Sequence, residues 1–128
     1  MLTKPQVFIS STILNLPSER KAALRAVEKV GGIPIMSEFT MEAVDNNSLT
    51  ACLHKVSISD IYILILGGQY GWQPFDKESI TELEYNKAVE LKLAVLVFNT
   101  TYPKDSNQKD FEKRVEKDYY RKEVSDPF

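Results

Sequence analysis

The feature that most constrains the fold is an almost unbroken apolar run at residues 61–66, which ends in Gly67 and Gly68. A run of this length without polar alternation is typical of a strand buried on both faces of a parallel sheet. A loop follows, and residues 79–91 then show the apolar spacing of a helix. The sequence therefore predicts a strand that leads into a crossover helix, and such joints are where open α/β sheets bind ligands.

Three further apolar runs predict strands, at residues 6–10, 33–36 and 93–98. Pro34 places the second of these at an edge of the sheet. Helical patterns lie between the strands, beginning at Pro17 and at Ser48, which we interpret as a capping residue. Strands separated by helices in this rhythm form a parallel sheet with right-handed crossovers. We therefore expect a three-layer, flavodoxin-like α/β fold with a short parallel sheet in the order 2-1-3-4.

The composition changes after residue 100, and residues 110–122 combine dense charge with apolar residues at helical spacing. We expect residues 1–100 to form the α/β domain. Residues 101–128 are then a charged peripheral helix or the start of a linker to a missing region. The lack of a further strand before Phe128 suggests a fragment of a longer protein.

Composition excludes several classes of function. The 128 residues carry a net charge of −2, so no broad positive field is present to bind a nucleic-acid backbone. One cysteine and one histidine do not supply a cysteine- or histidine-rich metal site, and the lone thiol fits a reducing, cytoplasmic location. No signal peptide is visible, and the longest apolar run is far shorter than the roughly 20 residues that span a bilayer. We expect no metal, no direct nucleic-acid binding and no membrane partner.

Glu84 interrupts the apolar face of the predicted helix at residues 79–91. Ile80 and Ala88 occupy the same stripe, which should pack on the sheet. A carboxylate in the early turns of such a helix suits a general acid or base, or an anchor for ribose hydroxyls. The structural alternative is a glutamate whose stem packs while its carboxylate reaches solvent or pairs with Lys87 or Lys92.

Ser10, Ser11 and Thr12 follow the first predicted strand, and Arg20 lies in the next predicted helix. Hydroxyls, backbone amides and a guanidinium in this arrangement suit the binding of a phosphate or a ribose. The same residue types are common in turns and helix caps, which is the structural alternative. Neither GxGxxG nor GxxxxGKS/T occurs, so we do not expect a tight pyrophosphate-binding loop.

The loop after the central strand is rich in glycine and aromatic residues. Gly67 and Gly68 permit close approach to the backbone, and Tyr70 and Trp72 supply rings on which a base or a nicotinamide can stack. The alternatives are local packing, capping of the sheet, or a protein interface, where both aromatic residue types are enriched. Cys52 falls on the apolar stripe of its helix, and we interpret it as a core residue.

Several segments together resemble a known family. They are residues 7–12 (VFISST), 19–20 (ER), 59–62 (SDIY), 66–72 (LGGQYGW) and 79–85 (SITELEY). With these segments at this spacing, about the first hundred residues resemble the family named domain of unknown function 4062. That family is similar to TIR domains and, more distantly, to nucleoside 2-deoxyribosyltransferases, which implies a TIR-like version of the α/β fold.

The resemblance also implies roles for individual residues. In the deoxyribosyltransferase-like enzymes a catalytic glutamate begins an E-x-x-x-A helix pattern, which Glu84 and Ala88 match. In NAD-cleaving TIR domains a serine and a tryptophan-cysteine pair precede the glutamate. Ser79 corresponds to that serine, whereas Ile80 and Thr81 replace the pair.

At the level of the whole protein, the resemblance implies an N-terminal effector or signalling domain of a larger defence protein in innate immunity. A STAND-type NTPase, such as a NACHT module, would follow it in the longer chain. One implied activity is hydrolysis of the N-glycosidic bond of NAD or a related nucleotide, with Glu84 catalytic and no cofactor beyond that substrate. The alternatives are a non-enzymatic domain that self-associates with like domains, and a nucleotide-sensing module without turnover.

Overall fold

Strands and helices alternate along the chain. The computed structural model describes residues 4–11, 16–36 and 46–118. Its strands are β1 (Gln6–Ser10), β2 (Ile33–Met36), β3 (Ile61–Leu66) and β4 (Ala94–Asn99). Its helices are α1 (Pro17–Lys29), α2 (Asn46–Ser57), α3 (Ile80–Glu90) and α4 (Ser106–Asp118). The alternation follows the prediction from the apolar runs.

The four strands form one parallel sheet in the order β2-β1-β3-β4, which confirms the predicted flavodoxin-like arrangement. The strand with Pro34 lies at an edge, where a residue without a backbone N–H is tolerated. The chain reverses its direction of winding between β1 and β3, and Ser10 at the end of β1 lies opposite Leu64 of β3. This reversal is the place where open parallel sheets bind ligands, at their carboxyl edge.

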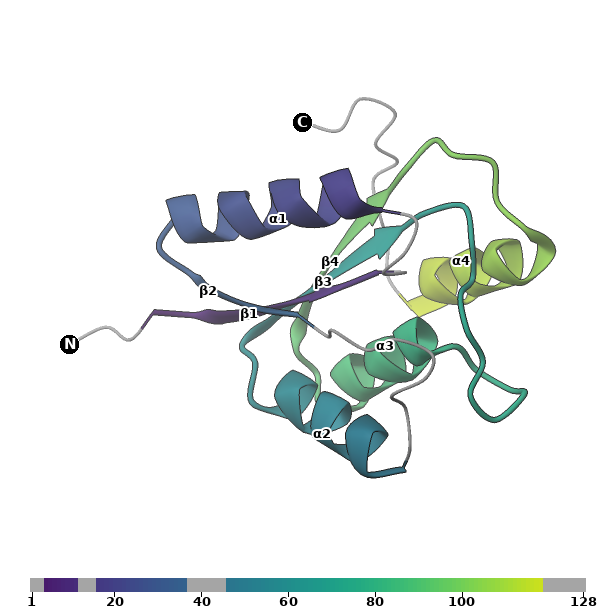
Figure 1. Ribbon diagram of the computed structural model, residues 1–128, viewed down its shortest axis with the longest axis horizontal. Coiled ribbons are helices and arrows are strands. Elements are labelled where there is room, and N and C mark those ends of the chain that lie inside the picture. The colour runs from purple at the N-terminus through teal and green to yellow at the C-terminus, as the bar shows by residue number, and fades with distance from the viewer. Residues whose placement is uncertain (1–3, 12–15, 37–45, 119–128) are drawn as a thin grey trace.

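Helices cover both faces of the sheet (Figure 1). Because side chains alternate along a strand, Val7 and Ile9 of β1 pack with Val27 of α1 on one face. Phe8 of β1 points to the opposite face, where α2, α3 and α4 lie. The core of that second face includes fully buried aromatic residues from the sheet and from two helices: Phe8, Tyr62, Tyr85 and Phe111.

Local sequence signals explain both ends of α1 and the start of α3. Pro17 stands at the first position of α1, where a missing N–H costs nothing, and Gly31 adopts a positive φ of 88° just after the helix. Ser79 is the N-cap of α3, and its side chain accepts a hydrogen bond of 3.1 Å from the backbone N–H of Glu82.

The structure differs from the sequence-based expectation at three boundaries. Helix α2 begins at Asn46, so Ser48 lies within its first turn and is not the residue before the helix. Strand β4 begins at Ala94, one residue later than expected. Helix α4 begins at Ser106, because the Asp105 carboxylate accepts a 2.8 Å hydrogen bond from the backbone N–H of Gln108 and so caps the helix there.

Helix α4 packs into the same core as the sheet. Phe111 and Val115 are both fully buried, and the Phe111 ring meets the ring of Tyr85 edge-on at 5.5 Å between centroids. Helix α4 therefore shares a hydrophobic core with the sheet. Among the residues that the structure describes, no helix is both long and apolar enough to cross a membrane.

Candidate functional site

The Glu84 carboxylate is buried between the sheet and two helices. Its residue is only 2% exposed, although it stands in the middle of α3. The Ser10 hydroxyl donates to Oε1 at 2.8 Å, and the Cys52 thiol donates to Oε2 at 2.6 Å. A buried carboxylate requires such partners, since an unpaired one is strongly destabilising.

Three elements bring these groups together. Ser10 points to the same face of the sheet as Phe8, because residues two apart on a strand share a face. Cys52 belongs to the core cluster on that face, and α3 lies beside α2. Ser10 and Glu84 are thus brought together in the structure. Lys87, which the structural alternative offered as a partner for Glu84, instead lies 3.5 Å from Glu90.

Tyr62 of β3 adds a hydroxyl to this buried cluster. Burial raises the pKa of its phenol well above the usual value of 10.0, the Glu84 carboxylate raises it further, and the Ser10 hydroxyl acts in the opposite direction. The phenol is therefore neutral, and its hydroxyl donates to the backbone oxygen of Thr81 at 3.5 Å. The cluster thus gains a polar group from Tyr62 without a second negative charge.

Ser11 and Arg20 meet immediately beyond the end of β1. The Arg20 guanidinium donates to the Ser11 hydroxyl at 2.9 Å and to the Ser11 backbone oxygen at 3.4 Å. Both residues are buried, so this cation is held beside the strand end and not in bulk water. Thr12, the third hydroxyl residue predicted here, lies outside the described residues.

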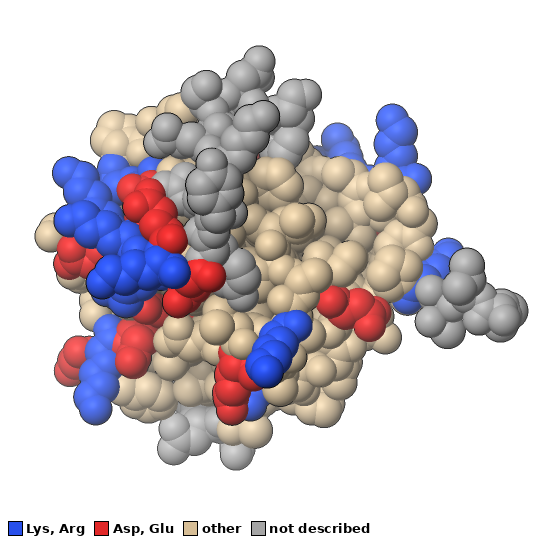
Figure 2. All heavy atoms as spheres, turned by 180° about the vertical axis from the view of Figure 1, so that it is seen from behind, with Lys and Arg blue, Asp and Glu red and all other residues tan. Residues whose placement is uncertain are grey.

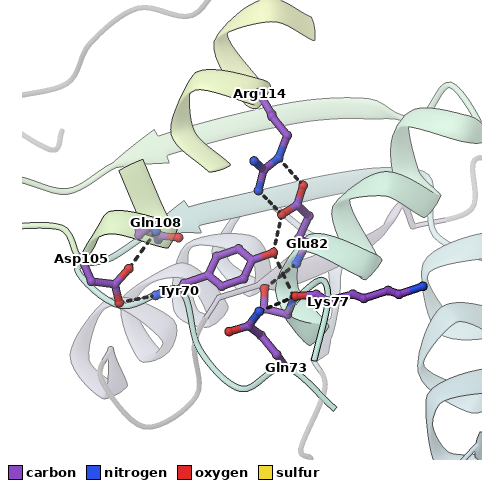
Figure 3. A network of polar contacts seen from close by, with 8 residues as sticks. Tyr70, Gln73, Lys77, Glu82, Asp105, Gln108 and Arg114 are labelled. Carbon is purple, nitrogen blue, oxygen red and sulfur yellow. Dashed lines mark hydrogen bonds and ion pairs between the residues drawn. The ribbon is translucent and has the colours of Figure 1, made fainter. Parts of the chain in front are cut away.

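A second polar network ties the loop after β3 to helices α3 and α4 (Figure 3). The Tyr70 hydroxyl donates to Glu82 Oε1 at 2.5 Å, and Arg114 donates to both carboxylate oxygens of Glu82, at 2.7 Å and 2.5 Å. Burial and the hydrogen bond to Glu82 raise the pKa of Tyr70, and the hydrogen bond to Glu82 raises that of Arg114. The ion pair therefore links α4 to the first turn of α3.

This network modifies a common helix-capping arrangement. Ser79 and Glu82 have the spacing of a capping box, in which the glutamate would accept from the serine N–H. Here the Ser79 N–H donates to the Tyr70 hydroxyl oxygen at 3.1 Å, which leaves the Glu82 carboxylate for Arg114. Ser79 is fully buried, and its side chain caps α3, so capping accounts for a serine at this position.

The Tyr70 ring is buried and meets the Phe111 ring edge-on. It therefore packs in the core and offers no exposed face on which a base or a nicotinamide could stack.

The two glycines after β3 are approached closely by the protein itself. A Cβ atom at Gly67 would lie 2.7 Å from a side-chain carbon of Leu16, and one at Gly68 would lie 2.5 Å from the backbone oxygen of Pro103. The Gly67 carbonyl accepts from the Gln108 side chain at 3.0 Å. The space beside these two glycines is thus occupied by Leu16 and Pro103 of the protein itself, and not left open for a ligand. Trp72 is partly buried, and its backbone oxygen accepts from Ile80 at 3.2 Å.

Sequence reasoning did not identify three of the groups that define these networks. Cys52 was interpreted as core, and it is in the core, but its thiol also contacts Glu84. Glu82 could have been found from its capping-box spacing with Ser79. Arg114 carries no such local signal, because its partner is far away in the sequence. Within the described part of the chain, no group of three or more His, Cys, Asp or Glu residues is placed to hold a metal ion.

A parallel sheet in the order 2-1-3-4, with a buried carboxylate beside the end of β1, defines a flavodoxin-like α/β domain with a candidate ligand site at that carboxylate. The family described as "Domain of unknown function (DUF4062)" matches residues 6–127. The chain belongs to this family, and the match includes α4 as well as the segments that carried the resemblance. A search of curated proteins finds no match.

Proposed function

We propose that this domain is a TIR-like N-terminal effector or signalling domain of a larger cytoplasmic defence protein, and that it hydrolyses the N-glycosidic bond of NAD or a related nucleotide. The observation that supports this is the position of Glu84. Its carboxylate is hydrogen-bonded to Ser10, the last residue of β1, beside the reversal of winding where such sheets bind ligands.

In the proposed reaction the bond between the anomeric carbon and the nicotinamide nitrogen breaks, and its electron pair leaves with the nicotinamide. Water then adds to the anomeric carbon and releases a proton. Glu84 binds the ribose hydroxyls or stabilises the positive charge that develops on the sugar. Arg20 and Ser11, which are hydrogen-bonded to each other beyond the same strand end, would bind a phosphate of the nucleotide in this proposal.

The burial of Glu84 sets a condition on this activity. At 2% exposure the carboxylate meets a ribose only after the groups that cover it move apart. Activity should therefore depend on conditions that favour an open site, such as assembly of domains by an attached NTPase module. This dependence also distinguishes an effector domain from a permanently active hydrolase.

The test is NAD consumption by the chain at high concentration, with and without a crowding agent, followed by mass spectrometry of the products. We expect release of nicotinamide, and loss of at least about a hundredfold in kcat for Glu84→Gln, which removes the charge and keeps the shape. Glu90→Gln is the matched control, because Glu90 is an exposed carboxylate on the same helix. Wild-type chain that cleaves no member of a nucleotide panel would contradict the proposal.

A second candidate function is self-association with like domains without catalysis. It is favoured by an uncovered apolar position on the edge strand β4, where Leu96 is 49% exposed. The back of the molecule is largely uncharged around its centre, whereas charged side chains gather on the side of α4 (Figure 2). An exposed apolar side chain within a weakly charged surface is typical of protein interfaces.

A further inference from the structure

Cys52 lies in the buried cluster around Glu84. Cys52 is 2% exposed, and its thiol donates a hydrogen bond to Glu84 Oε2. A residue that served packing alone could be any small apolar side chain at this point of α2. The thiol instead donates its hydrogen to the Glu84 carboxylate, and burial keeps it away from solvent.

The two contacts on Glu84 come from two different elements. Ser10 approaches Oε1 from the sheet, and Cys52 approaches Oε2 from α2. With one oxygen held by each layer, the carboxylate plane is fixed relative to the end of β1. Rotation about its terminal bond would break at least one of these hydrogen bonds, and an unpaired buried acceptor costs about 1–3 kcal/mol.

We infer that Cys52 is a positioning residue, which fixes the Glu84 carboxylate in the orientation required at the candidate site by donating its thiol hydrogen to Oε2. It does not contact substrate. The kinetic part of this inference rests on the proposed glycosidase function, whereas the hydrogen bond itself does not. Two measurements therefore test it separately.

The first measurement is the infrared S–H stretching band, which lies in a region free of other protein bands. The chain has one cysteine, so the band reports on Cys52 alone, and Cys52→Val serves as the blank. We expect a band at a lower frequency than that of a free thiol, and a shift to the frequency of a free thiol in Glu84→Met. Glu90→Gln should leave the band unchanged. A wild-type band already at the free-thiol frequency, or one that Glu84→Met does not move, would overturn the inference.

The second measurement compares two substitutions of Cys52 in NAD cleavage. Cys52→Ser keeps a donor in a polar side chain, and Cys52→Val keeps the apolar packing and removes the donor. If Cys52 positions Glu84, the valine variant loses about tenfold to a hundredfold in kcat with little change in KM, and the serine variant recovers most of it.

If the valine variant instead keeps the kcat of the wild type and the serine variant loses it, Cys52 serves packing alone. Wild-type chain without any NAD cleavage would refute the proposed function, and the infrared result would still decide whether Cys52 holds Glu84. Circular dichroism of each variant verifies that the fold is kept.

Discussion

At the residue scale, the buried groups around Glu84 belong to four different elements. Ser10 comes from β1, Cys52 from α2, Tyr62 from β3 and Glu84 from α3. A carboxylate, a thiol and two hydroxyls would each be destabilising in an apolar core, and together they satisfy one another. The electrostatic properties of each group are therefore set by its neighbours.

Tyr62 should make stability sensitive to alkaline pH. Its pKa in the folded protein is raised above the usual 10.0, mainly by burial and then by Glu84. A group whose pKa is raised by folding contributes stability below its unfolded pKa, and this contribution is lost as the pH rises towards the folded pKa. We expect the free energy of unfolding to fall above about pH 10 in the wild type, and to fall less steeply in Tyr62→Phe. Urea unfolding from pH 8 upward measures both curves, and parallel curves would contradict this assignment.

At the scale of elements, α4 and the residue before it hold the loop between β3 and α3 in place. Asp105 accepts from the backbone N–H of Tyr70 at 3.1 Å, and Arg114 holds Glu82 in the first turn of α3 (Figure 3). The buried Phe111 ring packs between these contacts, against Tyr70 and Tyr85. The helix thus fixes the loop that leads to the helix carrying Glu84.

Removal of the Phe111 ring should therefore destabilise the whole domain. Phe111 is fully buried, so we expect Phe111→Ala to lower the free energy of unfolding by about 3–5 kcal/mol. Phe75→Ala is the matched control, since Phe75 is 53% exposed and its loss should change stability by less than about 0.5 kcal/mol. Chemical denaturation measures the free energy of unfolding of both variants and of the wild type. Equal effects of the two substitutions would mean that α4 is not part of the core.

At the scale of the whole molecule, the two faces of the sheet are covered unequally. Helix α1 lies over one face, and α2, α3 and α4 lie on the other (Figure 1). Leu96 pairs in register with Ile63, whose side chain packs on the α1 side, so both point to the less covered face. An apolar residue on an edge strand is open to contacts with another chain.

Leu96→Lys should weaken association of the domain if like domains pair through this face. We expect wild-type chain to show concentration-dependent mass in sedimentation equilibrium, and the variant to remain monomeric with little change in its melting temperature. Ile33→Lys is the control, because Ile33 is 44% exposed on the opposite edge strand β2. A wild-type chain that stays monomeric at every concentration would remove the support for self-association.

Much of the fold follows from local sequence signals. Apolar runs, glycines and prolines predicted the strands, the helix order and the sheet order, because periodicity and chain connectivity restrict α/β topologies strongly. The same periodicity placed Glu84 on the apolar face of its predicted helix, and the pattern of residues 6–12 placed Ser10 at the carboxyl end of the first strand. Helix boundaries were less accurate, since a side-chain cap such as Asp105 is one signal among several competing ones.

The amino-acid sequence by itself thus determined the order of elements, the parallel sheet and the position of Glu84 on the apolar face of its helix. Only the tertiary structure decided which groups meet that carboxylate, that Tyr70 turns into the core, and that Arg114 on α4 pairs with Glu82. The physical reason is that periodicity fixes the face on which a side chain lies. Its partners depend on how whole elements pack, and residues that are distant in the sequence meet only when the sheet and its helices are assembled.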